Sequence, residues 1–199
     1  MKISPAVLAL FATAFIAACS TSAKTYYYTL GISPAEQSRE ASSKAAVVNS
    51  ARPRIAITAL TVPEIVDRRE LVLRSGETQV LISDNHLWAE ALKNEIARNL
   101  GAHLARAAGT MGVLLPGQKN QAAAEIKLAV DILRFESVLG GNATLEARWN
   151  IVRQGVATPV SGHALIQEPA NAPGYDALVE AHNRALARLS DKIAATLNP

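Results

Sequence analysis

Apolar and polar residues alternate along several stretches of the chain, and this pattern predicts β-strands. The alternation is clearest over residues 54–62, 126–132 and 145–151, because successive side chains of a strand point to opposite faces of a sheet. Residues 25–30 contain three consecutive tyrosines, which favour a strand. Further strands are expected at 160–166 and, more briefly, at 111–115.

Turn residues connect these predicted strands. Ser75-Gly76-Glu77 separates residues 70–74 from 79–82, and Gly140-Gly141-Asn142 precedes the strand that contains Trp149. Both segments have the composition of hairpin turns. Leu133 and Phe135 reverse the phase of the preceding alternation, which indicates a bulge or a strand that is buried on both faces.

Two longer segments have the spacing of amphipathic helices. In residues 86–107 apolar side chains recur every fourth position, after the capping oxygens of residues 83–85. In residues 175–197 an apolar stripe, which includes His182, runs at intervals of three and four. Residues 35–52 lack such a pattern and are expected to form a connection or a frayed helix.

Together these elements predict an α/β (α+β) fold. The expected architecture is a two-layer sandwich, in which two main helices pack on one face of a largely antiparallel sheet. Only one domain is expected, from residue 25 to residue 199, and the order of the elements shows no repeat of solenoid length.

The first residues of the chain resemble a bacterial lipoprotein signal. Met1 and Lys2 precede an apolar stretch that ends in Ile16-Ala17-Ala18-Cys19, and this stretch is shorter than the about 20 residues that cross a bilayer. Residues 1–18 are therefore expected to be a signal peptide, cut between Ala18 and Cys19. In the lipobox that this sequence resembles, the cysteine carries acyl groups such as palmitate. The alternative is an ordinary signal peptide with an incidental cysteine.

Lipidation defines the expected location of the mature chain. Residues 19–24 would be a short lipidated tether, and several acyl chains would hold the protein durably in a membrane. Ser20 follows the cysteine. By resemblance to bacterial lipoproteins, which usually carry aspartate at that place when they stay in the inner membrane, we expect anchoring in the outer membrane with the domain in the periplasm.

Composition excludes several classes of function. The chain has 199 residues with 49% hydrophobic content, so a folded core is expected rather than disorder. A single cysteine excludes an internal disulfide and zinc sites built on paired thiolates. The net charge of +3 comes from scattered residues, and the tyrosine-rich strand lacks interleaved arginines, so no nucleic acid partner is expected.

No catalytic or cofactor motif is present in the sequence. The four histidines include no pair at helical metal-ligand spacing, and no phosphate-binding loop with its lysine occurs. Ser161-Gly162-His163 does not have the order of a nucleophile elbow, and His182 is expected to be a core histidine. Glu64, Asp67 and Glu70 alternate with arginines, which predicts salt bridges rather than acid–base catalysis. We therefore expect no metal, no cofactor and no enzymatic activity.

Several segments, in order along the chain, carry a resemblance to a known family. The most informative runs from Thr61 to Arg74 and contains Val62-Pro63, Asp67-Arg68-Arg69 and Arg74. The others are Tyr26-Tyr27-Tyr28-Thr29-Leu30, Leu87-Trp88-Ala89-Glu90-Ala91-Leu92, Trp149-Asn150-Ile151, Tyr175-Asp176-Ala177-Leu178-Val179 and Leu189-Ser190-Asp191-Lys192-Ile193-Ala194. Together these segments resemble the PqiC/YmbA-type auxiliary lipoproteins of ABC transport systems. One departure is Leu87, where members of that family often have arginine.

This resemblance implies an auxiliary component of a lipid transport system. Its partner would be an MCE-domain protein anchored in the inner membrane, and the system would move lipids across the periplasm and maintain membrane integrity. We expect Asp67, Arg68, Arg69 and Arg74 to contribute to a contact with that partner or with another subunit of a homo-oligomer. The alternative is that Asp67 and Arg68 only hold a β-turn.

Three other functions are also compatible with the sequence. The domain could be an outer-membrane assembly factor, a carrier that binds lipid itself, or a hydrolase that uses Ser161 and His163. A lipid carrier requires an apolar cavity that accommodates acyl chains, and a hydrolase requires a nucleophile within reach of its base.

Overall fold

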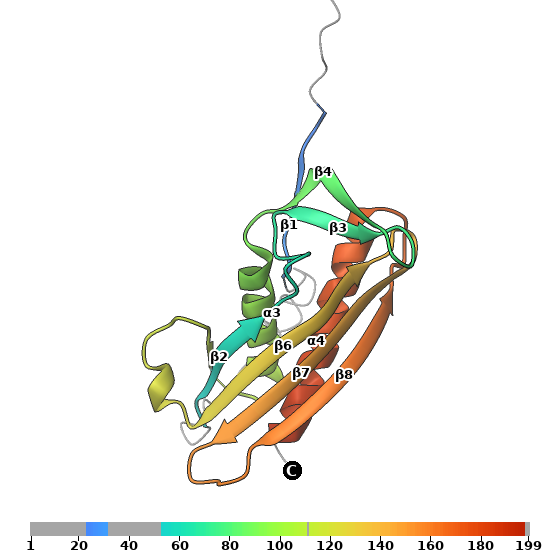
Figure 1. Ribbon diagram of the computed structural model, residues 1–199. Helices are drawn as coiled ribbons and strands as arrows, with labels where there is room; N and C mark the ends of the chain where they lie inside the picture. The colour runs from blue at the N-terminus through green and yellow to red at the C-terminus, as the bar shows by residue number, and fades with distance from the viewer. Residues whose placement is uncertain (1–22, 32–52, 111, 198–199) are drawn as a thin grey trace, which may run out of the picture.

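The computed structural model describes residues 23–31, 53–110 and 112–197. Within these ranges the chain forms one eight-stranded mixed sheet with two α-helices (Figure 1). The α+β sandwich predicted from the sequence is thereby confirmed. The strands are β1 (Tyr26–Tyr28), β2 (Ile55–Thr61), β3 (Glu70–Arg74), β4 (Val80–Trp88), β5 (Val113–Leu114), β6 (Ile126–Ser137), β7 (Asn142–Arg153) and β8 (Val160–Pro169).

The three longest strands, β6, β7 and β8, form an antiparallel meander that ends at β8 on one edge of the sheet. β6 pairs with β7 from Ile126 opposite Arg153 to Ser137 opposite Ala143, and β7 pairs with β8 along almost its whole length. The register of β6 shifts between Ile132 and Arg134, which confirms the bulge that the sequence indicates there.

The other edge of β6 is shared by two strands that run parallel to it. β2 pairs with the first half of β6, and β5 adds to the outer edge of β2. At the far end of β6, Ser137 lies opposite Leu73 of β3. β3 forms an antiparallel hairpin with β4, and β1 pairs in parallel with the end of β4, where Tyr26 lies opposite His86.

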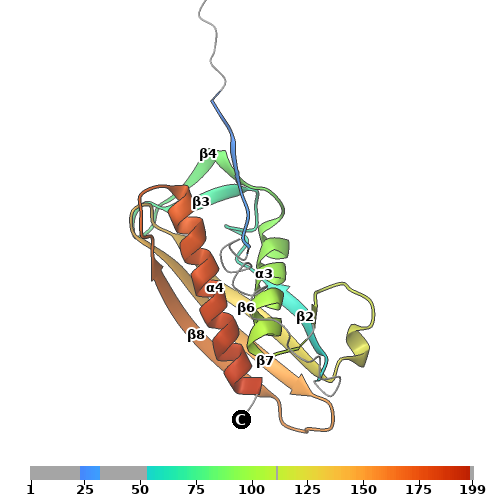
Figure 2. The ribbon, with the colours of Figure 1, turned by 180° about the vertical axis from the view of Figure 1, so that it is seen from behind.

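Both helices, α3 (Leu92–Ala107) and α4 (Tyr175–Leu197), cover the same face of the sheet (Figure 2). Their apolar stripes are buried as predicted. The core contains Ile96 and Leu100 of α3, and Leu186 and Leu189 of α4, all with no measurable exposure. Trp88 and Trp149 also lie in the core.

The predicted start of the first helix is wrong. Residues 83–85 do not cap a helix but continue β4 to Trp88, and α3 begins at Leu92 with no side chain capping its N-terminus. The reason is a long-range pairing, because β1 binds the backbone of residues 86–88 and holds it extended. Trp88 and Leu92 therefore have helical spacing although they belong to different elements.

Two groups of segments mark opposite ends of the molecule. The chain enters through β1 at the end formed by β3 and β4, whereas the β7–β8 turn and the end of α4 lie at the other end (Figures 1 and 2). Cys19, residues 1–18, for which a signal peptide is predicted, and residues 35–52, for which a connection or a frayed helix is predicted, lie outside the described residues.

Candidate functional site: a charged sheet face and its adjoining turn

The segment between β2 and β3 is a tight turn that its own backbone closes. Pro63 accepts hydrogen bonds from the N–H groups of Val66 (3.0 Å) and Asp67 (3.1 Å), and Arg68 N–H donates to the Val66 carbonyl (2.8 Å). Val66 is buried, and Trp88 N–H of β4 donates to the Arg69 carbonyl (2.6 Å). The turn is thus fixed to the core through the Val66 side chain and the Arg69 carbonyl, without using the charged side chains of residues 67–69.

These charged side chains project from the turn. Asp67, Arg68 and Arg69 are all exposed. Arg68 Nε donates to Glu70 Oε2 at 2.9 Å, and this hydrogen bond is the main reason that the pKa of Glu70 is lowered. Among the described residues, the Asp67 and Arg69 side chains make no hydrogen bond or ion pair. The turn is held by backbone groups, so Asp67 and Arg69 are available for a contact.

Arg74 does not lie with the other three predicted contact residues. It ends β3, four residues beyond Glu70, or about 13 Å along an extended strand. Its guanidinium is half-buried and donates to Glu136 of β6 at 2.7 Å and to the Glu77 carbonyl at 3.1 Å. Arg74 therefore lies on the open face of the sheet and not on the turn of residues 63–69.

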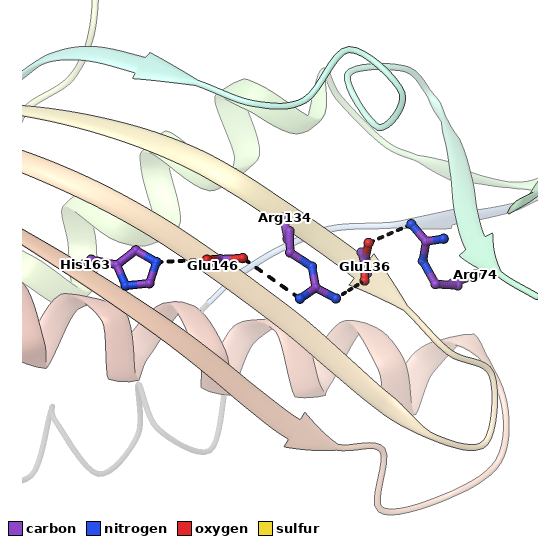
Figure 3. A network of polar contacts seen from close by, with 5 residues as sticks. All are labelled: Arg74, Arg134, Glu136, Glu146 and His163. Atoms are coloured by element: carbon purple, nitrogen blue, oxygen red, sulfur yellow. Dashed lines mark hydrogen bonds and ion pairs between the residues drawn. The ribbon is translucent and has the colours of Figure 1, made fainter. Parts of the chain in front are cut away.

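A chain of alternating charges crosses that open face (Figure 3). Glu136 lies between Arg74 and Arg134, each with a nitrogen at 2.7 Å. Arg134 also lies 3.9 Å from Glu146 of β7, which in turn is 2.9 Å from Nε2 of His163 on β8. The network therefore joins β3, β6, β7 and β8 across the face that carries no helix.

The electrostatics of the network keep its central carboxylate ionised. Burial by itself would raise the pKa of Glu136, but the hydrogen bonds from Arg134 and Arg74 outweigh burial and lower that pKa. A second pair lies on the same face, where Arg148 donates to Asp131 at 2.7 Å and Thr61 also binds Asp131. The hydrogen bonds from Thr61 and Arg148 lower the pKa of Asp131.

A small hollow lies where the turn meets the charged network, and apolar side chains form most of its lining. Its volume is about 70 Å³, well below the roughly 300–1,000 Å³ of pockets that enclose ligands. Ile65 and Val80 at its rim are 50% and 39% exposed. The lining residues are Pro63, Ile65, Val66, Val72, Arg74, Val80, Leu133, Arg134, Phe135, Glu136 and Ser137. The hollow therefore fits an inserted side chain rather than an acyl chain.

The residues of the hydrolase alternative do not form a catalytic pair. Ser161 and His163 lie two positions apart on β8 and are both exposed. Nε2 of His163 is bound to Glu146, and within the described residues no hydrogen bond joins the imidazole to Ser161. A nucleophile needs its base within hydrogen-bond distance, so this arrangement favours a polar surface over catalysis.

A serine–histidine pair does occur in the interior. Ser137 Oγ lies 2.8 Å from Nε2 of His182, and the imidazole stacks on Phe135 with ring centroids 3.9 Å apart. His182 is 1% exposed and Ser137 is 5% exposed, and burial lowers the pKa of His182 to about 3. The pair has no access for a substrate, which confirms the prediction that His182 belongs to the core.

Within residues 23–31, 53–110 and 112–197, no three or more side chains of His, Cys, Asp and Glu gather as potential metal ligands. Neither α3 nor α4 combines the length and the apolar character that crossing a membrane requires.

Comparison with known proteins identifies the family. Residues 28–194 match the model of the ABC-type transport auxiliary lipoprotein component. This match covers nearly all of the folded part, so the chain belongs to that family of lipoproteins, as the order of its sequence segments indicates. No curated protein matches the chain.

Solved structures with the same fold support this assignment of architecture. A crystal structure described as an uncharacterized protein superposes with a TM-score of 0.67 at 20% identity, covering 88% of this chain and 99% of that one. The crystal structure of protein XCC0632 from Xanthomonas campestris, of family DUF330, gives a TM-score of 0.59 at 16% identity and covers 88% and 98%. At these identities the likeness concerns the fold.

Proposed function

We propose that this protein is a lipid-anchored, non-catalytic docking component of an ABC-type lipid transport system. In this proposal residues 1–18 are removed, Cys19 is acylated and the domain faces the periplasm from the outer membrane. Its partner is the MCE-domain protein of the inner-membrane transport system, and the assembly serves envelope integrity. Membership of the auxiliary lipoprotein family supports the role in transport.

The observation that carries the proposal is the turn of residues 63–69. Its backbone is closed by Pro63 and fixed to β4, while Asp67 and Arg69 remain exposed and unpaired within the described part of the chain. A preorganised turn loses little conformational entropy when it binds. Charges of both signs on one rigid turn can also select an orientation of the partner through electrostatic complementarity.

The adjoining hollow adds an apolar component to this docking surface. Ile65 is half exposed beside the turn, and the hollow of about 70 Å³ lies between it and Arg74. Protein interfaces commonly combine a small apolar centre with a polar rim. Arg74, Arg134 and Glu136 supply such a rim here.

Crosslinking in the cell envelope tests the proposal. A photo-crosslinking amino acid at Asp67 or Arg69 should yield a covalent adduct with the transporter's periplasm-spanning subunit. The same group at Asp191 or Lys192, which are exposed on α4, should yield far less of that adduct. Equal yields at both places, or none at residues 67 and 69, would contradict docking through this turn.

Charge reversal gives a functional test of the same surface. Arg69→Glu should increase the sensitivity of cells to detergent. Lys192→Glu changes the charge by the same amount but lies on α4, outside the proposed contact, so it should leave that sensitivity unchanged. The folded state should tolerate both substitutions, since both side chains are exposed. Wild-type resistance in the Arg69→Glu strain, with normal protein levels, would remove Arg69 from the contact.

A further inference from the structure

The point at which the chain enters the domain lies close to the proposed lipid anchor. Tyr26 begins β1 only seven residues after Cys19. An extended chain advances at most about 3.5 Å per residue, so the backbone of Tyr26 lies within about 25 Å of the acylated cysteine. The end of the molecule formed by β1, β3 and β4 (Figure 1) is therefore held near the membrane.

This end exposes large apolar groups with polar tips. Tyr26 is 42% exposed and Tyr27 is 59% exposed, although they point to opposite sides of β1. Lys24 Nζ lies 5.1 Å from the centre of the Tyr26 ring. Tyrosine rings and lysine stems of this kind are favoured at the boundary between lipid headgroups and acyl chains, where one end is apolar and the other is hydrated.

Other exposed apolar side chains lie at the same end. Leu81 of β4 is 55% exposed, and Val138 and Leu139 of the β6–β7 turn are 41% and 49% exposed. That turn follows Ser137, which pairs with Leu73 of β3 and so brings the turn beside the β3–β4 hairpin. Val152, Val156 and Val160 are also exposed at the opposite end, so the tether end is distinguished by its tyrosines and by its closeness to the proposed anchor rather than by apolar exposure alone.

Tyr26 is part of an aromatic stack that fixes its position. His86 of β4 stacks between Tyr26, at 5.1 Å, and Tyr175 at the start of α4, at 3.6 Å. Tyr28 Oη lies 2.6 Å from Nδ1 of His86. The stack joins β1 to β4 and α4, so the Tyr26 ring is held in a fixed position against the folded domain.

We propose that the tether-end surface, formed by Lys24, Tyr26, Tyr27 and Leu81, inserts into the headgroup region of the bilayer that holds Cys19. This inference rests on the lipid anchor of the proposed function. The short tether favours the membrane over other occupants, because it gives the bilayer a high effective concentration at this surface. Insertion at one end directs the β7–β8 turn, at the other end (Figure 2), away from the membrane.

Fluorescence quenching in vesicles tests this orientation. The acylated mature protein is reconstituted into phosphatidylethanolamine–phosphatidylglycerol vesicles that contain lipids brominated on the acyl chains. The reporter variant is Tyr27→Trp, and the matched control is Val156→Trp, which replaces a residue of similar exposure, 52%, in the β7–β8 turn. Trp88 and Trp149 are buried, so the parent protein supplies the background signal.

The expected result is blue-shifted emission and strong quenching for Tyr27→Trp, together with emission typical of water and weak quenching for Val156→Trp. Equal weak quenching of both variants would overturn the inference. A blue shift of Tyr27→Trp that depends on protein concentration and occurs without quenching would also overturn it, because a second copy would then cover the surface. The intact mass of the protein separates the failure of this inference from the failure of the proposed function. A mass that shows an unmodified Cys19 thiol would contradict the lipid anchor. An acylated protein in which the Tyr27→Trp fluorescence is not quenched would contradict only the insertion of the tether-end surface.

Discussion

Glu95 of α3 accepts a hydrogen bond from the backbone N–H of Leu30, 65 positions earlier in the chain, at 3.1 Å in the interior. Leu30 lies two residues after the end of β1, so this hydrogen bond holds the chain that follows β1 against the helical layer. Gly31 N–H extends the attachment by donating to Asn183 of α4, which also accepts from Asn99. A buried polar cluster, rather than β1 pairing alone, therefore connects the tether to both helices.

Glu95 should make stability depend on pH in a specific direction. Burial raises its pKa above the ordinary value of 4.5, against the opposing effect of Arg98. The folded state then binds the proton more tightly than the unfolded state, so this group's contribution to the free energy of unfolding falls as the pH rises from 4.5 through the folded-state pKa. Glu95→Gln should abolish that contribution, and urea unfolding between pH 4 and pH 8 measures it.

Glu90→Gln is the control for this experiment. Glu90 binds the same arginine, Arg98, at 2.7 Å but is 56% exposed. The charge of Glu90 adds less than burial does to the raised pKa of Glu95, so its replacement should change the pH dependence of unfolding far less than Glu95→Gln does. Parallel stability curves for the wild type and Glu95→Gln would show that the carboxylate of Glu95 is not held at a raised pKa.

Gly162 of β8 should not tolerate a side chain. It lies opposite Trp149 of β7, and a Cβ at this position would be 2.2 Å from the indole. Trp149 is buried and close to Thr196 of α4, so it cannot swing away freely. Gly162→Ala should lower the free energy of unfolding by about 1–3 kcal/mol, as overpacked cores do, measured by urea denaturation.

Gly76 provides the comparison for that substitution. An added Cβ there would meet only Gln79 at 3.8 Å, which is ordinary contact. Gly76→Ala should therefore change stability by about 0.5 kcal/mol or less. If Gly162→Ala proved equally mild, the close approach of Trp149 to β8 would be wrong.

Glu136 should stabilise the fold in neutral solution and lose this effect in acid. Its pKa is lowered because hydrogen bonds from Arg134 and Arg74 outweigh burial. A group with a lowered folded-state pKa contributes stability above its ordinary value, here 4.5, and loses it as the pH falls through the folded-state pKa. Glu136→Gln should cost about 1 kcal/mol at pH 7 and less at pH 3, as measured by urea unfolding.

Salt provides a second criterion for the charged network. The Arg74 and Arg134 side chains are 33% and 43% exposed, so salt in the buffer should weaken their attraction to Glu136. The cost of Glu136→Gln should therefore shrink at about 1 M salt, where the screening length is about 3 Å. If Glu136→Gln lowered the free energy of unfolding equally at pH 7 and pH 3, and equally with and without added salt, the loss would reflect packing rather than charge.

The sequence predicted the elements that local patterns specify. Alternation placed β6 and β7 nearly as observed, and the stripe through His182 and Leu186 predicted α4. Local pattern failed where distant pairing decides. The apolar residues of 86–88 continue the helical spacing of α3, but pairing with Tyr26–Tyr28 holds this segment as a strand. The hydrophobic pattern of neither segment indicates that the two segments pair.

The candidate surface was predicted only in part for a similar reason. Asp67, Arg68 and Arg69 lie together because they are consecutive on one turn. Arg74 instead joins Glu136, 62 positions away, and Glu146 joins His163 through the pairing of β7 and β8. Such a network follows from strand register across the sheet, which charge spacing along a single chain does not specify.

Both proposals depend on lipid anchoring of the chain through Cys19. Intact mass spectrometry of the protein purified from its native envelope tests it most directly, alongside fractionation of a Cys19→Ala variant. We expect a chain that begins at residue 19 and carries the added mass of a diacylglycerol and a further acyl group, and a Cys19→Ala variant that is absent from the outer membrane. A water-soluble native protein with an unmodified thiol, or a Cys19→Ala variant that fractionates like the wild type, would contradict it.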